Sequence, residues 1–161
     1  MSFFHQNIVT LEGHKDELEN VLVNMNFTFD VIGLTETRIK LNSKPNYSLN
    51  LPDYKHFFTP TEMECGGTIL YVKKDVICKQ RTDLEKIMYK KRELESSFVE
   101  ITISKKKSII CGCIYKHPAM DIKEFNDEHL NTVLEKTLRK KKSLRSNLLF
   151  NKNTSSGKNK S

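Results

Sequence analysis

The stretch "FDVIGLTET", from Phe29 to Thr37, joins a short apolar run to a carboxylate directly behind it. "FDVIGL" is apolar and partly β-branched, which is typical of a strand buried on both faces of a sheet. Glu36 follows this strand, and ligands of open α/β sheets gather at the carboxyl ends of the strands. Glu36 is therefore either a solvated loop residue or part of a site.

The segments around this stretch alternate between strand and helix patterns. "FFHQNIV" predicts a first strand, and "HKDELENVLVNMNF" predicts an amphipathic helix. A polar segment with Pro45, Pro52 and Pro60 predicts a long loop. "GGTILYV" predicts a third strand, with "DVICKQ" as its antiparallel neighbour.

Two further patterns complete the prediction. "SFVEITI" and "SIICGCIY" indicate a pair of strands joined by a turn, and "DIKEFNDEHLNTVLEKTL" predicts a second helix with Asp121 as its N-cap. Strands and helices are mixed, with a hairpin among them. We therefore expect an α/β chain whose sheet is mixed rather than purely parallel.

The composition is that of a soluble globular domain. The chain has 161 residues, enough for about one domain. No stretch approaches the roughly 20 apolar residues that span a bilayer, and the start lacks the pattern of a signal peptide. We expect a cytoplasmic or nuclear protein that is not secreted and has no membrane partner.

The four cysteines favour free thiols. Cys65 and Cys78 are isolated, whereas Cys111 and Cys113 are two residues apart and so share one face of a strand. No cysteine or histidine spacing matches a zinc finger. The sequence therefore predicts neither a zinc site nor a disulfide-linked partner.

The net charge of +7 is concentrated at one end of the chain. Nine of the 27 basic residues and none of the acidic ones fall in residues 136–161, which leaves 18 basic against 20 acidic residues in 1–135. We expect a domain over 1–140 and a basic, disordered tail over 141–161. Lys140, Lys141 and Lys142 are candidate nucleic-acid contacts.

Polar side chains follow three of the predicted strands, at Asn7, at Glu36 and in Tyr115-Lys116-His117. An amide oxygen and a carboxylate form a hard-oxygen pair that Mg²⁺ accepts. A phenol beside a cation suits phosphate oxygens. Taken singly, however, each of these residues is more often a cap, a solvated acid or a half-buried aromatic.

Six segments, read in order, carry a family resemblance. They are "NIVTLEGHKDELENVL", "FDVIGLTETRI", "GGTILYVKKDV", "ESSFVEITI", "IICGCIYKHP" and "FNDEHLNTVLEK". Over about residues 3–136 the chain resembles the endonuclease domain of non-LTR retrotransposon polyproteins, within the endonuclease/exonuclease/phosphatase superfamily. The resemblance implies a deoxyribonuclease-I-like layered α/β sandwich with mixed sheets, incomplete at the C-terminus.

The resemblance also implies hydrolysis of DNA phosphodiesters with Mg²⁺, for which Mn²⁺ can substitute. Glu36 looks like the family's metal-binding glutamate, and Asn7 looks like the asparagine that helps at the same ion. Tyr115 looks like the tyrosine that hydrogen-bonds the scissile phosphate. Lys116 and His117 follow in the same motif as candidate phosphate contacts.

The chain departs from the family pattern at several places. The family's aspartate that orients or deprotonates the attacking water corresponds, in a weak match, to Asn151 of "NLLFNKN". An amide cannot accept a proton as a carboxylate can. The family's Ser-Asp-His segment has no match here, and Val9 and Arg38 stand where the family usually has Arg and Trp.

These departures leave three functional interpretations open. The first is part of a Mg²⁺-dependent DNA endonuclease domain with impaired catalysis. The second is a non-catalytic remnant, or a nucleic-acid-binding protein that acts through its basic tail, and the third is a metal-dependent phosphatase of the same superfamily. An incomplete sheet would also expose an edge, which predicts self-association.

Overall fold

The computed structural model describes residues 1–41, 49–105 and 107–138. The chain divides into two compact units, the first from Met1 to Met120 and the second starting at Asp121. Each unit is described below by itself. The predicted boundary between a domain and a basic tail, at 140/141, lies outside the described residues.

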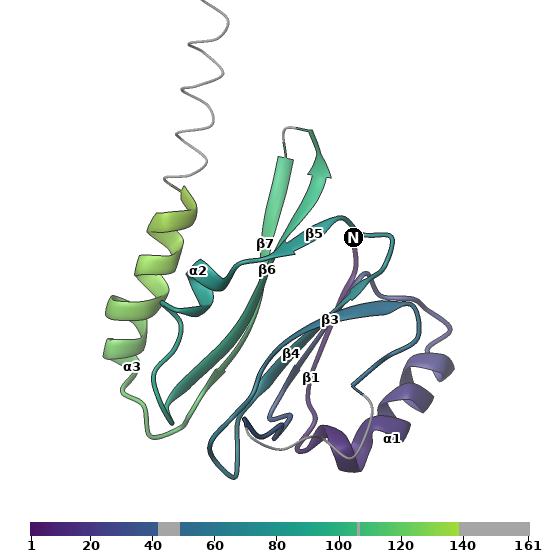
Figure 1. Cartoon of the computed structure of the whole chain (residues 1–161), viewed down its shortest axis with the longest axis horizontal. Coiled ribbons are helices and arrows are strands. Elements are labelled where there is room, and N and C mark those ends of the chain that lie inside the picture. The colour runs from purple at the N-terminus through teal and green to yellow at the C-terminus, as the bar shows by residue number, and fades with distance from the viewer. Residues whose placement is uncertain (42–48, 106, 139–161) are drawn as a thin grey trace, which may run out of the picture. The chain divides into compact units, whose positions relative to one another are not determined.

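The first unit contains two β-sheets (Figure 1). One has the strand order β1-β2-β4-β3, with β1 and β2 parallel and the other pairs antiparallel, and the second is the antiparallel sheet β5-β6-β7. The predicted α/β class with a mixed sheet is confirmed. The elements are β1 (Phe3–Asn7), α1 (Leu11–Asn24), β2 (Val31–Thr35), β3 (Tyr54–Thr59), β4 (Thr68–Lys73), β5 (Cys78–Gln80), α2 (Thr82–Glu85), β6 (Leu94–Ser104) and β7 (Lys107–Lys116).

Strand β2 is buried on both faces, as its sequence predicts. Ile32 and Leu34 belong to a core cluster that also contains Leu18 of α1, so this face of the sheet is covered by the helix. Val31 belongs to a second cluster with Val99 of β6, which lies between the two sheets. Full burial of one such side chain stabilises the fold by about 1.5–3 kcal/mol. Because β2 buries side chains on both faces, it stabilises both the packing against α1 and the packing between the two sheets.

Two predictions around the third strand are wrong. The segment predicted as a long loop contains β3, an aromatic-rich strand that runs antiparallel to β4. The prolines at 52 and 60 do not interrupt this strand, because both lie outside its bounds, Tyr54–Thr59.

The predicted hairpin of "TILYV" with "DVICKQ" does not form. After the turn in which Val76 N donates to Lys73 O, the chain crosses to the second sheet, and Cys78 pairs with Ile101 of β6. A tight turn at this point is typical of a hairpin, but here the four residues 74–77 connect the two sheets. The short helix α2, which follows β5, has no counterpart in the sequence prediction.

The predicted antiparallel pair of β6 and β7 is confirmed. Cys111 and Cys113 lie on the same face of β7 and pack into the cluster between the sheets. Burial raises the pKa of the Cys111 thiol to about 11 and that of Cys113 to about 12. Both therefore remain protonated thiols at neutral pH, and thiolates are the reactive form.

The second unit begins with the predicted N-cap, where Asp121 Oδ1 accepts a hydrogen bond from Glu124 N at 2.8 Å. The helix starts as α3 (Ile122–Glu124), passes through a π-helical segment (Phe125–Leu130) and remains helical to residue 138. The predicted second helix is therefore confirmed. Within the described ranges, no helix has the length and apolar character required to cross a membrane.

Candidate active site

The carboxyl ends of β1 and β2 lie side by side, because the strands are parallel and pair from Phe3 with Val31 to Asn7 with Thr35. Glu36 is the next residue after β2. The Asn7 side-chain Nδ2 donates a hydrogen bond to Glu36 Oε1 at 2.8 Å. The structure thus brings together the two residues that the sequence predicts at a metal ion.

The loop that carries Glu36 is held by segments on both of its sides. Thr10 N donates to Glu36 O at 2.8 Å, and Arg38 N donates to Gly66 O at 2.9 Å. Glu36 has a left-handed backbone, with φ 54°. Because that conformation costs a non-glycine residue roughly 1–2 kcal/mol, these contacts are needed to keep the carboxylate in position.

Tyr115 of β7 lies opposite Glu95 of β6 in the antiparallel register. Burial, a hydrogen bond with Cys65, and the charges of Cys65, Glu36 and Glu95 raise the pKa of Tyr115. The phenol therefore stays protonated at neutral pH and can donate a hydrogen bond to a phosphate oxygen. Gly66 links the Glu36 loop to Tyr115, since its carbonyl accepts a hydrogen bond from Arg38 N of that loop and a Cβ on it would lie 3.3 Å from Tyr115 Cδ1.

Gly66 and Gly67 form the wall of this site between Tyr115 and the Glu36 loop. Both have a left-handed backbone, with φ 104° and 81°. A Cβ on Gly66 would lie 3.3 Å from Tyr115 Cδ1, and one on Gly67 would lie 2.5 Å from Thr37 Oγ1. The close approach of the chain therefore requires glycine at both positions.

Glu95 is a residue of this site that the sequence prediction missed. Its side chain is buried, 5% exposed, and accepts a hydrogen bond from Gly67 N at 2.5 Å. Burial raises the pKa of Glu95, the hydrogen bonds from Gly67 and Thr61 oppose that rise, and the charge of Glu62 adds to it. An acid next to a buried strand residue is the feature of the sequence that indicates Glu95, because a buried acid requires hydrogen-bond partners.

The raised pKa of Glu95 makes a prediction about stability. The folded protein binds a proton at Glu95 above the ordinary pKa of 4.5, so this stabilisation is complete below that value and is lost as the pH rises through the folded pKa. Glu95→Gln keeps the acceptor for Gly67 but does not titrate. We expect wild type to lose stability relative to Glu95→Gln between pH 4 and 7, measured by urea unfolding at each pH.

Glu12→Gln is the matched control for this series, because Glu12 is an exposed acid in the first turn of α1. This variant shows how far the removal of an exposed carboxylate alone changes stability at each pH. A constant difference between wild type and Glu95→Gln would mean that Glu95 has an unperturbed pKa in the folded state.

For the other residues predicted to contact phosphate or nucleic acid, the structure shows no hydrogen bond to Asn7, Glu36 or Tyr115 within the described chain. Lys116 alternates with Tyr115 along β7, so its side chain starts toward the opposite face, and Nζ donates to the carbonyls of His117 and Met120. His117 Nδ1 accepts a hydrogen bond from Ala119 N at 3.1 Å. A phosphate contact at Lys116 or His117 stays a prediction. Asn151 and the basic residues Lys140, Lys141 and Lys142 lie outside the described residues.

The donor set of the site fits a weakly held Mg²⁺ ion. Glu36 Oε1 accepts the Asn7 amide, whereas Oε2 makes no hydrogen bond in the described chain and lies 3.9 Å from Arg38 Nη2. Mg²⁺ is commonly bound by one or two carboxylates together with waters and substrate phosphate. Asn7 presents its nitrogen to Glu36, so it would orient the carboxylate, and Glu36 Oε2 would be the ligand.

A second cluster of possible ligands occurs in the second unit. Glu124, Glu128 and His129 place their ligand atoms within 4.8 Å of one another. The π-helical segment explains this, since hydrogen bonds between residues five apart align positions four and five apart along one face. The sequence prediction did not include these residues, and Glu128 is exposed.

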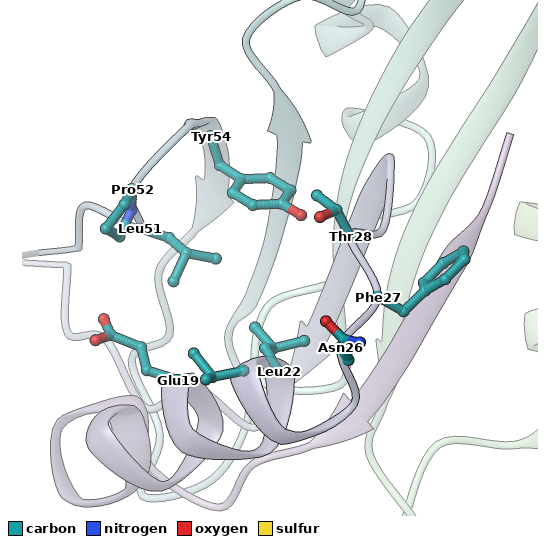
Figure 2. A pocket seen from close by; sticks show the side chains of 9 residues that line it. Glu19, Leu22, Asn26, Phe27, Thr28, Leu51, Pro52 and Tyr54 are labelled. Carbon is teal, nitrogen blue, oxygen red and sulfur yellow. The ribbon is translucent and has the colours of Figure 1, made fainter.

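Within the first unit, a pocket of about 360 Å³ lies at the end of β2 opposite to Glu36 (Figure 2). Figure 2 shows Leu22 of α1 facing Tyr54 of β3 across it, with Leu51 and Pro52 beside Tyr54. Its lining includes the turn that precedes β2, whereas Glu36 follows β2. The pocket therefore does not take part in the site built by Asn7, Glu36 and Tyr115.

No family model and no curated protein matches the sequence. The structure is similar to the AP endonuclease LMAP from Leishmania major, with a TM-score of 0.53 and 14% identity over 84% of this chain. It also matches the catalytic domain of Xenopus laevis APE2, with a TM-score of 0.47 and 13% identity over 83% of this chain. This chain spans 46% of the first protein's length and 49% of the second's.

The likeness to LMAP, together with the two sheets described above, confirms the expected fold class. The chain has a deoxyribonuclease-I-like α/β sandwich, in which one sheet is mixed and the other is antiparallel. At 14% identity the likeness extends to the fold alone.

Proposed function

We propose that this chain carries the ion-binding and phosphate-binding residues of a nuclease-like phosphodiesterase site. The observation that carries the proposal is the hydrogen bond between Asn7 and Glu36 at the ends of two parallel strands. Tyr115, with its raised pKa, supplies a neutral donor under the influence of the same carboxylate. The carboxylate can bind a cation, the amide can orient that carboxylate, and the phenol can donate a hydrogen bond to a phosphate beside the cation.

Each residue has a distinct role in this proposal. A divalent ion held at Glu36 would neutralise charge that builds on the phosphate. Asn7 orients the Glu36 carboxylate, and the Tyr115 hydroxyl donates to a phosphate oxygen. Glu95 is a positioning residue, because it holds the Gly66–Gly67 wall through the Gly67 N–H.

The finer parts of the proposal rest on the sequence. The order and residues of the six segments that carry the family resemblance favour Mg²⁺ as the ion, DNA as the substrate and a non-LTR retrotransposon endonuclease as the origin. Impaired catalysis is proposed because Asn151 stands near the place of the family's water-orienting aspartate. Of the two carboxylates that act on Tyr115, Glu95 is already occupied by Gly67 and Thr61.

A second candidate function is nucleic-acid binding through the basic C-terminal residues. The separation of charge supports it, since residues 136–161 hold nine basic and no acidic residues. Binding of that kind is independent of sequence and falls steeply with salt. A cytoplasmic or nuclear location, and self-association through β7, whose one partner in the described sheet is β6, remain proposals as well.

We expect the purified chain not to nick supercoiled plasmid DNA in Mg²⁺ above background. General-base assistance is worth on the order of 10²–10⁴-fold, and its loss would put the rate below a plasmid assay. The comparison is wild type against Glu36→Ala, purified in parallel so that contaminating nuclease is equal in both. Nicking by wild type that is absent from Glu36→Ala would show that the chain is a complete enzyme.

A further inference from the structure

We propose that Arg38 is a phosphate-binding residue of the site and takes the non-bridging oxygens of a phosphodiester. This inference deepens the proposed function and rests on it for the nature of the ligand. Arg38 is one of the departures from the pattern of the family that the sequence resembles, which usually has Trp at this position.

The backbone of Arg38 is held in a conformation that is unfavourable for arginine. Its φ is 56°, in the left-handed region. Two hydrogen bonds to the glycine wall maintain it, from Arg38 N to Gly66 O at 2.9 Å and from Thr37 N to Gly67 O at 3.3 Å. Strain of this kind costs of order 1–3 kcal/mol and clusters at ligand-binding positions.

The guanidinium of Arg38 has unused hydrogen-bonding capacity. Its Nη2 lies 3.9 Å from Glu36 Oε2, which is an ion pair but too long for a hydrogen bond. Its Nε is buried and has no hydrogen-bond partner in the described chain. Leaving a buried donor unsatisfied costs about 1–3 kcal/mol, and more for a charged group, so an anionic acceptor would relieve that cost.

The surroundings of Arg38 select a phosphate as that acceptor. Gly66 contacts both residues, since its carbonyl accepts a hydrogen bond from Arg38 N at 2.9 Å and a Cβ on it would lie 3.3 Å from Tyr115 Cδ1. The planar fork of arginine matches two oxygens of a phosphate, and the neutral phenol can donate to a third acceptor position. With 38% of its side chain exposed, Arg38 is also open to solvent and to a ligand.

Titration with dimethyl phosphate, without divalent ions, tests this inference in the full-length protein. The backbone amide signals of Gly66 and Gly67 in ¹H–¹⁵N NMR report binding at the site. Comparison with Arg38→Gln, which keeps the C-terminal lysines, separates binding at Arg38 from phosphate bound at those lysines. We expect wild type to show saturable shifts at both glycines. Arg38→Gln should weaken the apparent affinity at least tenfold, and Arg38→Lys should fall between, because an ammonium lacks the planar fork.

Arg92→Gln is the matched control, because Arg92 is an arginine that shares the positive φ, 65°. Equal shifts in wild type and Arg38→Gln, or no shift at the glycines in wild type, would overturn the inference. If Arg38→Gln does not fold, Arg38→Lys decides alone, since an affinity equal to that of wild type would contradict a bidentate contact. Because no divalent ion is present, a failed nicking or metal-binding experiment leaves this result intact.

Discussion

Replacing Glu36 by glutamine is expected to abolish the binding of Mn²⁺ at the site. Glu36 Oε2 makes no hydrogen bond in the described chain and so is open to an ion, whereas an amide oxygen carries no charge for a divalent ion. The enhancement of water proton relaxation on titrating Mn²⁺ into the protein measures the effect. Wild type should show weak binding, and Glu36→Gln should show only residual binding elsewhere.

Two further variants separate ligation from orientation. Asn7→Ala removes the hydrogen bond to Glu36 Oε1, and loss of such an orienting partner typically weakens metal binding 10–100-fold. Glu12→Gln removes an exposed acid of α1 and should leave the titration unchanged. Equal relaxation enhancement in wild type and Glu36→Gln would remove Glu36 from the ion site and would contradict the proposed function.

Gly67→Ala is expected to destabilise the fold by about 3 kcal/mol. Alanine at φ 81° is strained, which alone costs of order 1–3 kcal/mol. The new Cβ would also lie 2.5 Å from Thr37 Oγ1, so that the loop carrying Glu36 must shift. Urea unfolding measures the loss of stability as a lower transition midpoint with an unchanged slope.

Gly13→Ala provides the matched control, because Gly13 lies inside α1 and a Cβ there meets only Thr10 Cγ2, at 3.2 Å. Alanine is favoured over glycine in a helix by about 0.8–1 kcal/mol, so this variant should be as stable as wild type or more stable. A midpoint for Gly67→Ala that matches the wild-type value would mean that the glycine wall can relax without cost.

Patterns confined to a single segment predicted much of the fold correctly. The apolar run before Glu36 predicted a strand buried on both faces, and β2 has core clusters on both sides. Asp121 predicted the start of the second helix from its own spacing to Glu124. Such features depend on neighbouring residues alone, so they can be inferred before the chain's long-range contacts are known.

The errors concern segments whose partners are distant in sequence. The placement of β5 depends on Ile101, which follows Cys78 by more than twenty residues, whereas the prediction paired β5 with the strand directly before it. Strand β3 lies within the segment predicted as a loop, because the prolines that flank it are typical of loops. Neither pairing follows from local periodicity, because a strand's partner is set by the packing of the whole sheet.

The residues of the site show the same contrast between features that depend on local sequence and features that depend on long-range contacts. Asn7 and Glu36 were predictable, since each follows a strand and the ends of parallel strands meet. Glu95 was not, because its role depends on the register that sets it opposite Tyr115 and on the approach of Gly67. The position of Arg38 beside Glu36 likewise depends on hydrogen bonds to a glycine segment almost thirty residues away.

The membership of β2 in both core clusters has a consequence for how the first unit opens. The layer formed with α1 and the layer between the sheets both pack on this strand, so its two faces become exposed only when both layers open. Local opening that exposes β2 amides is therefore coupled to global unfolding. Glu36 follows β2 directly, and its loop is hydrogen-bonded to Thr10 on one side and to Gly66 on the other, so we expect motion of the carboxylate to follow motion of these two segments.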